Sequence, residues 1–74
     1  MNETFAECYI MDEDRTTAKA VYDACKDESY ILDPQLVKKA NGHYAVMCGF
    51  KNRNTMQMIV GKFEKKFPGK LSWR

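Results

Sequence analysis

The stretch Asn41–Phe50, NGHYAVMCGF, holds the only histidine of the chain and one of its three cysteines. Histidine and cysteine side chains bind zinc, and together they can form a nucleophile and its base. A structural zinc site needs four such ligands, usually in closely spaced pairs, but the sequence contains no CxxC. On one strand, positions 43 and 48 also point to opposite faces. We therefore expect no metal, no cofactor and no catalytic pair among His43, Cys8 and Cys48.

A second candidate for chemistry is the run of acids Asp12, Glu13 and Asp14, which could attract Mg²⁺. The run stands where the cap and first turn of a helix are expected, and capping explains it without a metal. Arg15 follows without the glycines that a phosphate-binding loop requires. No other catalytic arrangement is found, so we expect a protein that is not an enzyme.

Length and composition favour one soluble globular domain over residues 1–74. The chain is 45% apolar and 30% charged, and it contains no apolar run near the length of a membrane helix. Its first ten residues lack the basic start and apolar core of a secretion signal. An odd number of cysteines argues against a disulfide framework and for reduced thiols. We expect a complete cytoplasmic protein.

Hydrophobic spacing predicts most of the elements that would position these residues. Residues 4–11 alternate with a period of two, which is typical of a strand, and residues 70–74 form a short last strand. Residues 12–28 and 53–67 each carry one apolar stripe at helical spacing. Asn54 or Thr55 can cap the second helix, and Pro68 with Gly69 ends it.

The segment between the helices has two interpretations. Asn41-Gly42 is a strong hairpin signal, and residues 44–50 form a convincing return strand. Residues 34–41 also fit a short helix, with Asp33 as its cap and Pro34 at its first position. We favour the hairpin, and Pro34 then forces its strand to an edge of the sheet or to a bulge, because proline cannot donate to a ladder.

A two-residue turn at Asn41-Gly42 would pair Val37 with Val46 and Leu36 with Met47. The resulting order indicates an α+β fold of the ferredoxin-like, split β-α-β-β-α-β type, with a four-stranded antiparallel sheet and both helices on one face.

The charges are divided between the two halves of the chain. Residues 1–37 carry nine acids and three bases, whereas residues 38–74 carry nine bases and one acid. Such asymmetry can mark a basic binding surface, or it can mean that two oppositely charged elements pack together. In the expected fold the acidic first helix lies beside the basic second helix, so we favour mutual neutralisation.

The sheet face that points away from the helices is the expected binding surface. If Ala6, Cys8 and Ile10 face the helices, Phe5 and Tyr9 face outward. Exposed apolar patches of this kind usually mark partner sites. We expect a small non-enzymatic modulator or inhibitor that docks on a host protein, similar in type to the inhibitors of phages and mobile elements, and either monomeric or a weak homodimer. The expected contact residues are Phe5, Tyr9, Leu36, His43 and Met47.

The alternative is a single-stranded nucleic-acid binder. The stretch NGHYAVMC is similar to the third strand of the RRM family at Gly42 and Val46, with His43 in place of its first ring. Ala45 and Cys48 replace the other rings. Bases would stack on Phe5 and Tyr9 in this alternative, and phosphates would contact basic side chains. These are Lys38, Lys51, Arg53, Lys62, Lys65, Lys66 and Lys70.

Overall fold

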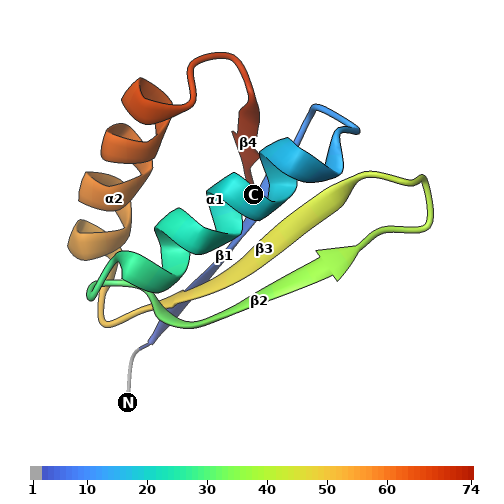
Figure 1. The fold of residues 1–74 in the computed structure, drawn as a ribbon. Helices are drawn as coiled ribbons and strands as arrows, with labels where there is room; N and C mark the ends of the chain where they lie inside the picture. Colours follow the sequence, from blue (N-terminus) through green and yellow to red (C-terminus); the bar gives the residue numbers. More distant parts are fainter. Residues whose placement is uncertain (1–2) are drawn as a thin grey trace.

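The computed structural model describes residues 3–74, whose strands form one antiparallel sheet in the order β2-β3-β1-β4 (Figure 1). Each helix connects two strands that have another strand between them, so two split βαβ units interleave. The expected α+β, ferredoxin-like arrangement is confirmed. The elements are β1 (Thr4–Ile10), α1 (Arg15–Asp27), β2 (Leu32–Lys38), β3 (Tyr44–Phe50), α2 (Arg53–Lys66) and β4 (Leu71–Trp73).

A single core lies between the sheet and the two helices. In β1 the alternate residues Ala6, Cys8 and Ile10 are buried, as the period of two predicts. Both helices contribute to the same cluster, α1 through Val21 and its neighbours and α2 through Phe63 and its neighbours. Both helices therefore cover one face of the sheet and leave the other face uncovered (Figure 1).

Side-chain caps start both helices. The Asp14 carboxylate accepts a hydrogen bond of 2.9 Å from the Thr16 backbone N–H, which confirms a cap within the acidic run. For α2 the cap is Asn52, whose side-chain oxygen accepts from the Thr55 N–H at 2.8 Å. The expectation of Asn54 or Thr55 is therefore wrong by two residues or more, because the helix already begins at Arg53. Neither helix among residues 3–74 has the length and apolarity to cross a membrane.

Residues 32–38 are a strand, so the interpretation of this segment as a short helix is wrong. β2 lies at the edge of the sheet, as Pro34 requires. Its pairing with β3 is interrupted between Leu32 and Gln35, and Asp33 has a positive φ of 48° there. This irregularity accommodates the proline, which has no N–H to donate to the ladder.

The hairpin turn has three residues instead of two. The Lys39 N–H donates to the His43 carbonyl at 2.7 Å, and the Gly42 N–H donates to the Lys39 carbonyl at 3.0 Å. Residues 40–42 therefore form the connection, and Gly42 takes the positive φ of 91° that ends such a turn.

The extra turn residue shifts the pairing of β2 by one position. Leu36 pairs with Val46 and Val37 pairs with Ala45, so the predicted pairs of Val37 with Val46 and Leu36 with Met47 are wrong. A shift of one residue moves every side chain to the other face of the sheet. Leu36 accordingly packs against the core instead of facing outward.

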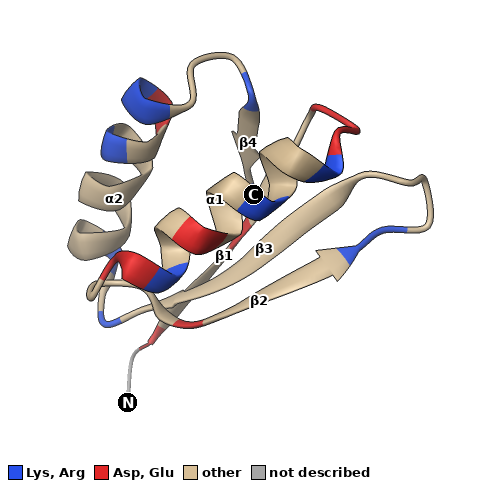
Figure 2. Ribbon diagram, viewed as in Figure 1, with Lys and Arg blue, Asp and Glu red and all other residues tan. Residues whose placement is uncertain are grey.

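Three ion pairs join the acidic half of the chain to the basic half, but only the pair of Lys62 with Glu28 joins α2 to the end of α1, as was expected for the two helices. Lys39 binds Glu7, Lys62 binds Glu28 and Lys70 binds Asp12, with nitrogen–oxygen distances of 2.8, 2.6 and 3.3 Å. In every one of these pairs the acid comes from residues 1–37 and the base from residues 38–74. Figure 2 shows both acids and bases along α1, so the first helix itself is not acidic as expected, whereas α2 and the loop after β2 carry mainly bases.

Candidate functional site

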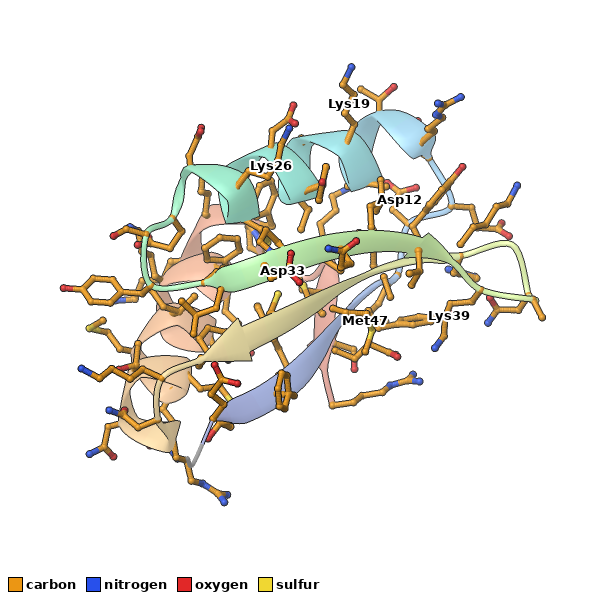
Figure 3. All side chains as sticks on the ribbon, turned by 90° about the horizontal axis from the view of Figure 1, so that it is seen from below. Asp12, Lys19, Lys26, Asp33, Lys39 and Met47 are labelled. Carbon is orange, nitrogen blue, oxygen red and sulfur yellow. The ribbon has the colours of Figure 1, made fainter. Side chains whose placement is uncertain are left out.

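The candidate site is the face of the sheet opposite the helices, which we call the open face. Phe5 and Tyr9 of β1 lie on it, because their neighbours Ala6, Cys8 and Ile10 point into the core. Met47 is paired with Glu7 and lies on the same face. In Figure 3, Met47 and Lys39 are on the side of the sheet away from α1, whereas Lys19 and Lys26 project from α1.

One end of the open face is apolar. Phe5 is 71% exposed, Met47 is 39% exposed and Leu32 is 38% exposed, and all three lie around Gly49. We call Phe5, Leu32, Met47 and Gly49 the sheet patch. It lines a hollow of about 190 Å³ whose rim includes Asp33. Large apolar side chains gathered in this way are uncommon on a surface that stays in water.

Gly49 keeps this hollow open. A Cβ atom at Gly49 would lie 3.2 Å from the Leu32 carbonyl oxygen and 3.5 Å from the ring of Phe5. Any side chain at this position would therefore fill the space between Phe5 and Leu32. Neither Gly49 nor Leu32 is among the residues expected from sequence. Pro34 indicated an edge or a bulge in this strand, but the sequence does not indicate that the bulge would turn Leu32 outward.

The other end of the open face is polar. The Glu7 carboxylate, only 16% exposed, accepts from the Lys39 ammonium at 2.8 Å and lies 4.0 Å from the Arg74 guanidinium. Both partners come from the strands or turns that flank β1. The carboxylate in the centre of the sheet is thus neutralised within the chain.

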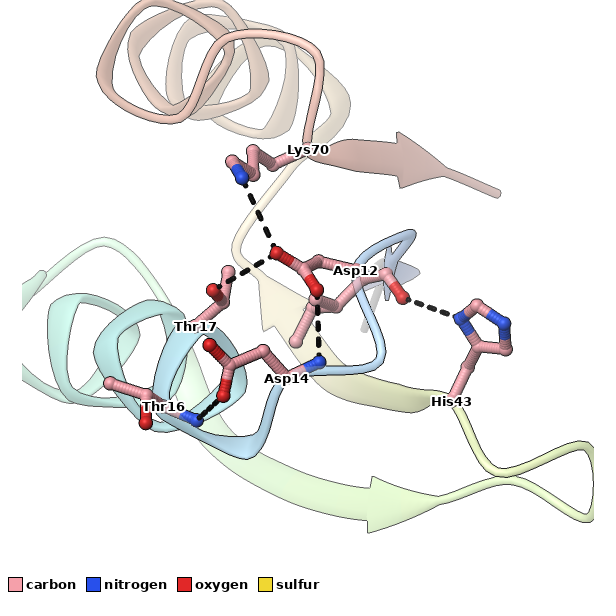
Figure 4. A network of polar contacts seen from close by, with 7 residues as sticks. Asp12, Asp14, Thr16, Thr17, His43 and Lys70 are labelled. Atoms are coloured by element: carbon pink, nitrogen blue, oxygen red, sulfur yellow. Dashed lines mark hydrogen bonds and ion pairs between the residues drawn. The ribbon is translucent and has the colours of Figure 1, made fainter.

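The expected residues Tyr9 and His43 belong to this polar end. Their rings are stacked, with 5.3 Å between centroids, and the Arg74 guanidinium lies 4.4 Å from the Tyr9 centroid. The Tyr9 hydroxyl accepts a hydrogen bond from the Asn41 amide at 3.0 Å. His43 Nδ1 lies 3.3 Å from the Ile10 carbonyl oxygen (Figure 4). Tyr9 and His43 are therefore held in place by contacts within the chain.

The structure brings four of the five expected contact residues to one face. Phe5 and Met47 form the apolar end, and Tyr9 and His43 form the polar end. Leu36 is the exception, because its side chain packs on the helix side. Gln35 takes the position opposite Met47 that was predicted for Leu36, and Leu32 faces outward opposite Gly49.

The acidic run is a structural cap. Asp12 accepts from the Asp14 N–H at 2.9 Å, and its other oxygen lies 3.3 Å from both the Thr17 hydroxyl and the Lys70 ammonium (Figure 4). The bond from the Asp14 N–H, together with Lys70, lowers the pKa of the Asp12 carboxyl. Across residues 3–74, no three histidine, cysteine or acidic side chains are grouped as metal ligands would be.

Among the basic residues of the nucleic-acid alternative, Arg53 lines a second hollow together with Phe5, whereas three others are engaged elsewhere. Lys62 and Lys70 are paired with Glu28 and Asp12. Lys38 lies over the ring of Tyr44, a residue that packs against the core on the helix side. Among the described residues, no ion pair is found for the remaining four, Lys51, Arg53, Lys65 and Lys66.

The three cysteines are buried in the core as free thiols. Burial, together with the charge of Cys48, raises the pKa of the Cys8 thiol to about 12. A thiol with so high a pKa is a poor nucleophile near neutral pH.

Comparison of the chain with protein-family models, curated proteins and solved structures finds no match. The function is therefore inferred from the geometry of the site.

Proposed function

We propose that the chain is a small non-enzymatic protein-binding modulator or inhibitor, of the kind that phages and mobile elements encode, which acts in the cytoplasm. It docks on a host protein through the open face. The partner inserts an apolar side chain into the hollow of the sheet patch and contacts Phe5 and Met47. The single observation that carries this proposal is the 71% exposure of Phe5 beside that hollow.

The polar end of the open face supports a docking role. Glu7 is neutralised by Lys39 and Arg74, so a partner that covers the sheet does not have to neutralise a buried carboxylate. Tyr9 and His43 are already ordered by their stacking, and ordered side chains lose less entropy on binding. An apolar anchor beside an ordered polar rim is the usual composition of a protein interface.

The alternative, single-stranded nucleic-acid binding, has less support. A base would have to stack on Tyr9, whose ring already contacts Arg74 and His43. Two of the expected phosphate-binding lysines, Lys62 and Lys70, are paired with carboxylates. A salt titration of a mixed single-stranded oligonucleotide tests this alternative, since phosphate binding weakens steeply as salt is added.

The proposal is tested by photo-crosslinking in the cells that make the protein. A photo-reactive phenylalanine analogue is placed at Phe5, at Met47 or at Met58 in separate variants. Met58 is the matched control, because it is a comparably exposed apolar residue on α2. We expect the same crosslinked protein from positions 5 and 47 and none of it from position 58. Crosslinking of that protein from position 58 alone would place the interface elsewhere.

A further inference from the structure

Among the described residues that line the hollow of the sheet patch, Asp33 alone carries a charge. Asp33 is exposed at the rim. The other lining residues have apolar or neutral side chains, and they include Gln35 beside the sheet patch itself. The hollow therefore combines apolar walls with one carboxylate.

The charge of Asp33 is not balanced by a base of the chain. No ion pair is found for Asp33 in the part of the chain that the structure describes. Its Oδ1 accepts a hydrogen bond of 2.9 Å from the Gln35 side-chain amide, which is neutral. The carboxylate of Glu7, at the polar end of the same face, is by contrast paired with Lys39. Asp33 thus gives the apolar end of the open face an uncompensated negative charge.

The backbone of β2 places this carboxylate beside the hollow. Pairing with β3 is interrupted between Leu32 and Gln35, and Asp33 has a positive φ of 48°. Irregularities of this kind redirect side chains and are frequent next to functional sites. The bond from Gln35 further restrains the carboxylate. The position of the charge is therefore set by the strand before any partner binds.

A partner that fills the hollow removes water from the carboxylate of Asp33. Taking an unpaired carboxylate out of water costs free energy, unless a positive charge pairs with it. Lysine and arginine side chains also lay their aliphatic stems along apolar surfaces while the charged head reaches outward. Such a side chain matches both the apolar walls formed by Phe5 and Met47 and the carboxylate at their rim.

We propose that the apolar residue which the partner inserts into the hollow is adjacent to a lysine or arginine, whose positive charge pairs with Asp33. This inference rests on the proposed function and adds the chemistry that selects the partner. An acidic residue at the same place on the partner would be repelled by Asp33, so the carboxylate also excludes wrong partners.

The test is an NMR titration of the isotope-labelled full chain with acetylated and amidated peptides at about 20 mM salt. The peptides Gly-Leu-Lys-Gly and Gly-Lys-Leu-Gly carry the base after or before the apolar residue, and glutamine replaces lysine in their neutral counterparts. We expect every peptide to shift the Gly49 amide and the Met47 methyl signals. At least one lysine peptide should bind about three- to fivefold more tightly than its glutamine counterpart. About 0.5 M salt should reduce this preference, because it screens exposed charges.

Asp33→Asn removes the charge with little change of shape. Asparagine keeps an oxygen that accepts from Gln35, and it tolerates a positive φ as aspartate does. This variant should bind the lysine and glutamine peptides equally. Asp23→Asn is the matched control, because it removes the same charge from an exposed position on α1. The preference for lysine should be retained in it.

The inference and the proposed function can fail separately. Equal dissociation constants of the lysine and glutamine peptides for the unmodified chain would overturn the inference, and so would a preference for lysine that persists in Asp33→Asn. Either result would leave the sheet patch in place as an apolar docking surface. Absence of shifts at Gly49 with every peptide would instead contradict the hollow as a binding site, and with it the proposed function.

Discussion

Lys62 in α2 donates to the carboxylate of Glu28 at the end of α1, with 2.6 Å between Nζ and Oε2. This bond connects the acidic and basic halves of the chain across the helix layer. Lys70, in the loop between α2 and β4, pairs in the same way with Asp12, in the loop between β1 and α1. The acidic and basic halves of the sequence are therefore joined by ion pairs within the fold. For this reason the charge division is weak support for a basic ligand-binding surface.

Stability should fall in acid because of these pairs. The hydrogen bond from Lys62 lowers the pKa of Glu28 below its ordinary 4.5, and the Asp14 N–H with Lys70 lowers that of Asp12 below 3.8. Their stabilisation is fully present above these ordinary values and is lost as the pH falls through the lower folded pKa values. Thermal unfolding between about pH 6 and pH 2 measures the effect. Glu28→Gln should show a shallower decline, and an unchanged profile would contradict this role of Glu28.

Gly61→Ala should stabilise the protein by about 0.5–1 kcal/mol, because glycine disfavours a helix interior. A Cβ atom there would meet nothing within 4 Å. Gly42→Ala is the control with the opposite sign, because Gly42 has a φ of 91°. It should destabilise by about 1 kcal/mol or more. Urea unfolding measures both, and a destabilising Gly61→Ala would show that α2 differs from the structure at this position.

The register of the hairpin can be tested at two adjacent residues. Leu36 packs against the core, whereas Val37 pairs with Ala45 on the open face. Leu36→Ala should cost about 2 kcal/mol of unfolding free energy, and Val37→Ala should cost less than about 1 kcal/mol. A larger loss of unfolding free energy in Val37→Ala than in Leu36→Ala would instead support the register of a two-residue turn. Urea unfolding of the two variants decides between the registers.

The cysteines should be inert in the folded protein. With a pKa of about 12 for Cys8, only about one thiol in 10⁴ is ionised at pH 8, and all three side chains are buried. Alkylation followed by mass spectrometry should find no labelled cysteine under native conditions and three after denaturation. Rapid labelling of Cys8 in the native state would contradict its burial.

The hydrophobic periodicity predicted the fold because the strands and helices that form the core are regular. The alternation of Phe5 to Ile10 and the stripe from Ala18 to Cys25 each match the buried faces in the structure. Each element repeats the same information over several residues, so a local error does not change the outcome.

The candidate site was harder to predict because it depends on single residues. One extra residue in the turn before Gly42 moved Leu36 to the core. The irregularity at Asp33-Pro34 brought Leu32 to the open face. The length of a turn and the irregularities of a strand decide which side of the sheet a residue faces. Neither changes the periodicity of the sequence, so periodicity cannot predict them. Phe5 and Met47 face outward as predicted, because β1 and β3 are regular.

The central claim, that the open face is the partner surface, is tested most directly by the affinity of the crosslinked partner for three purified forms of the chain. These are the unmodified protein, Phe5→Asp and Met58→Asp, which place the same charge at exposed apolar positions on opposite layers. Isothermal titration calorimetry should show binding weakened by about 30-fold or more in Phe5→Asp, as for an interface anchor, and almost unchanged binding in Met58→Asp. Equal affinity of Phe5→Asp and the unmodified protein would contradict the claim.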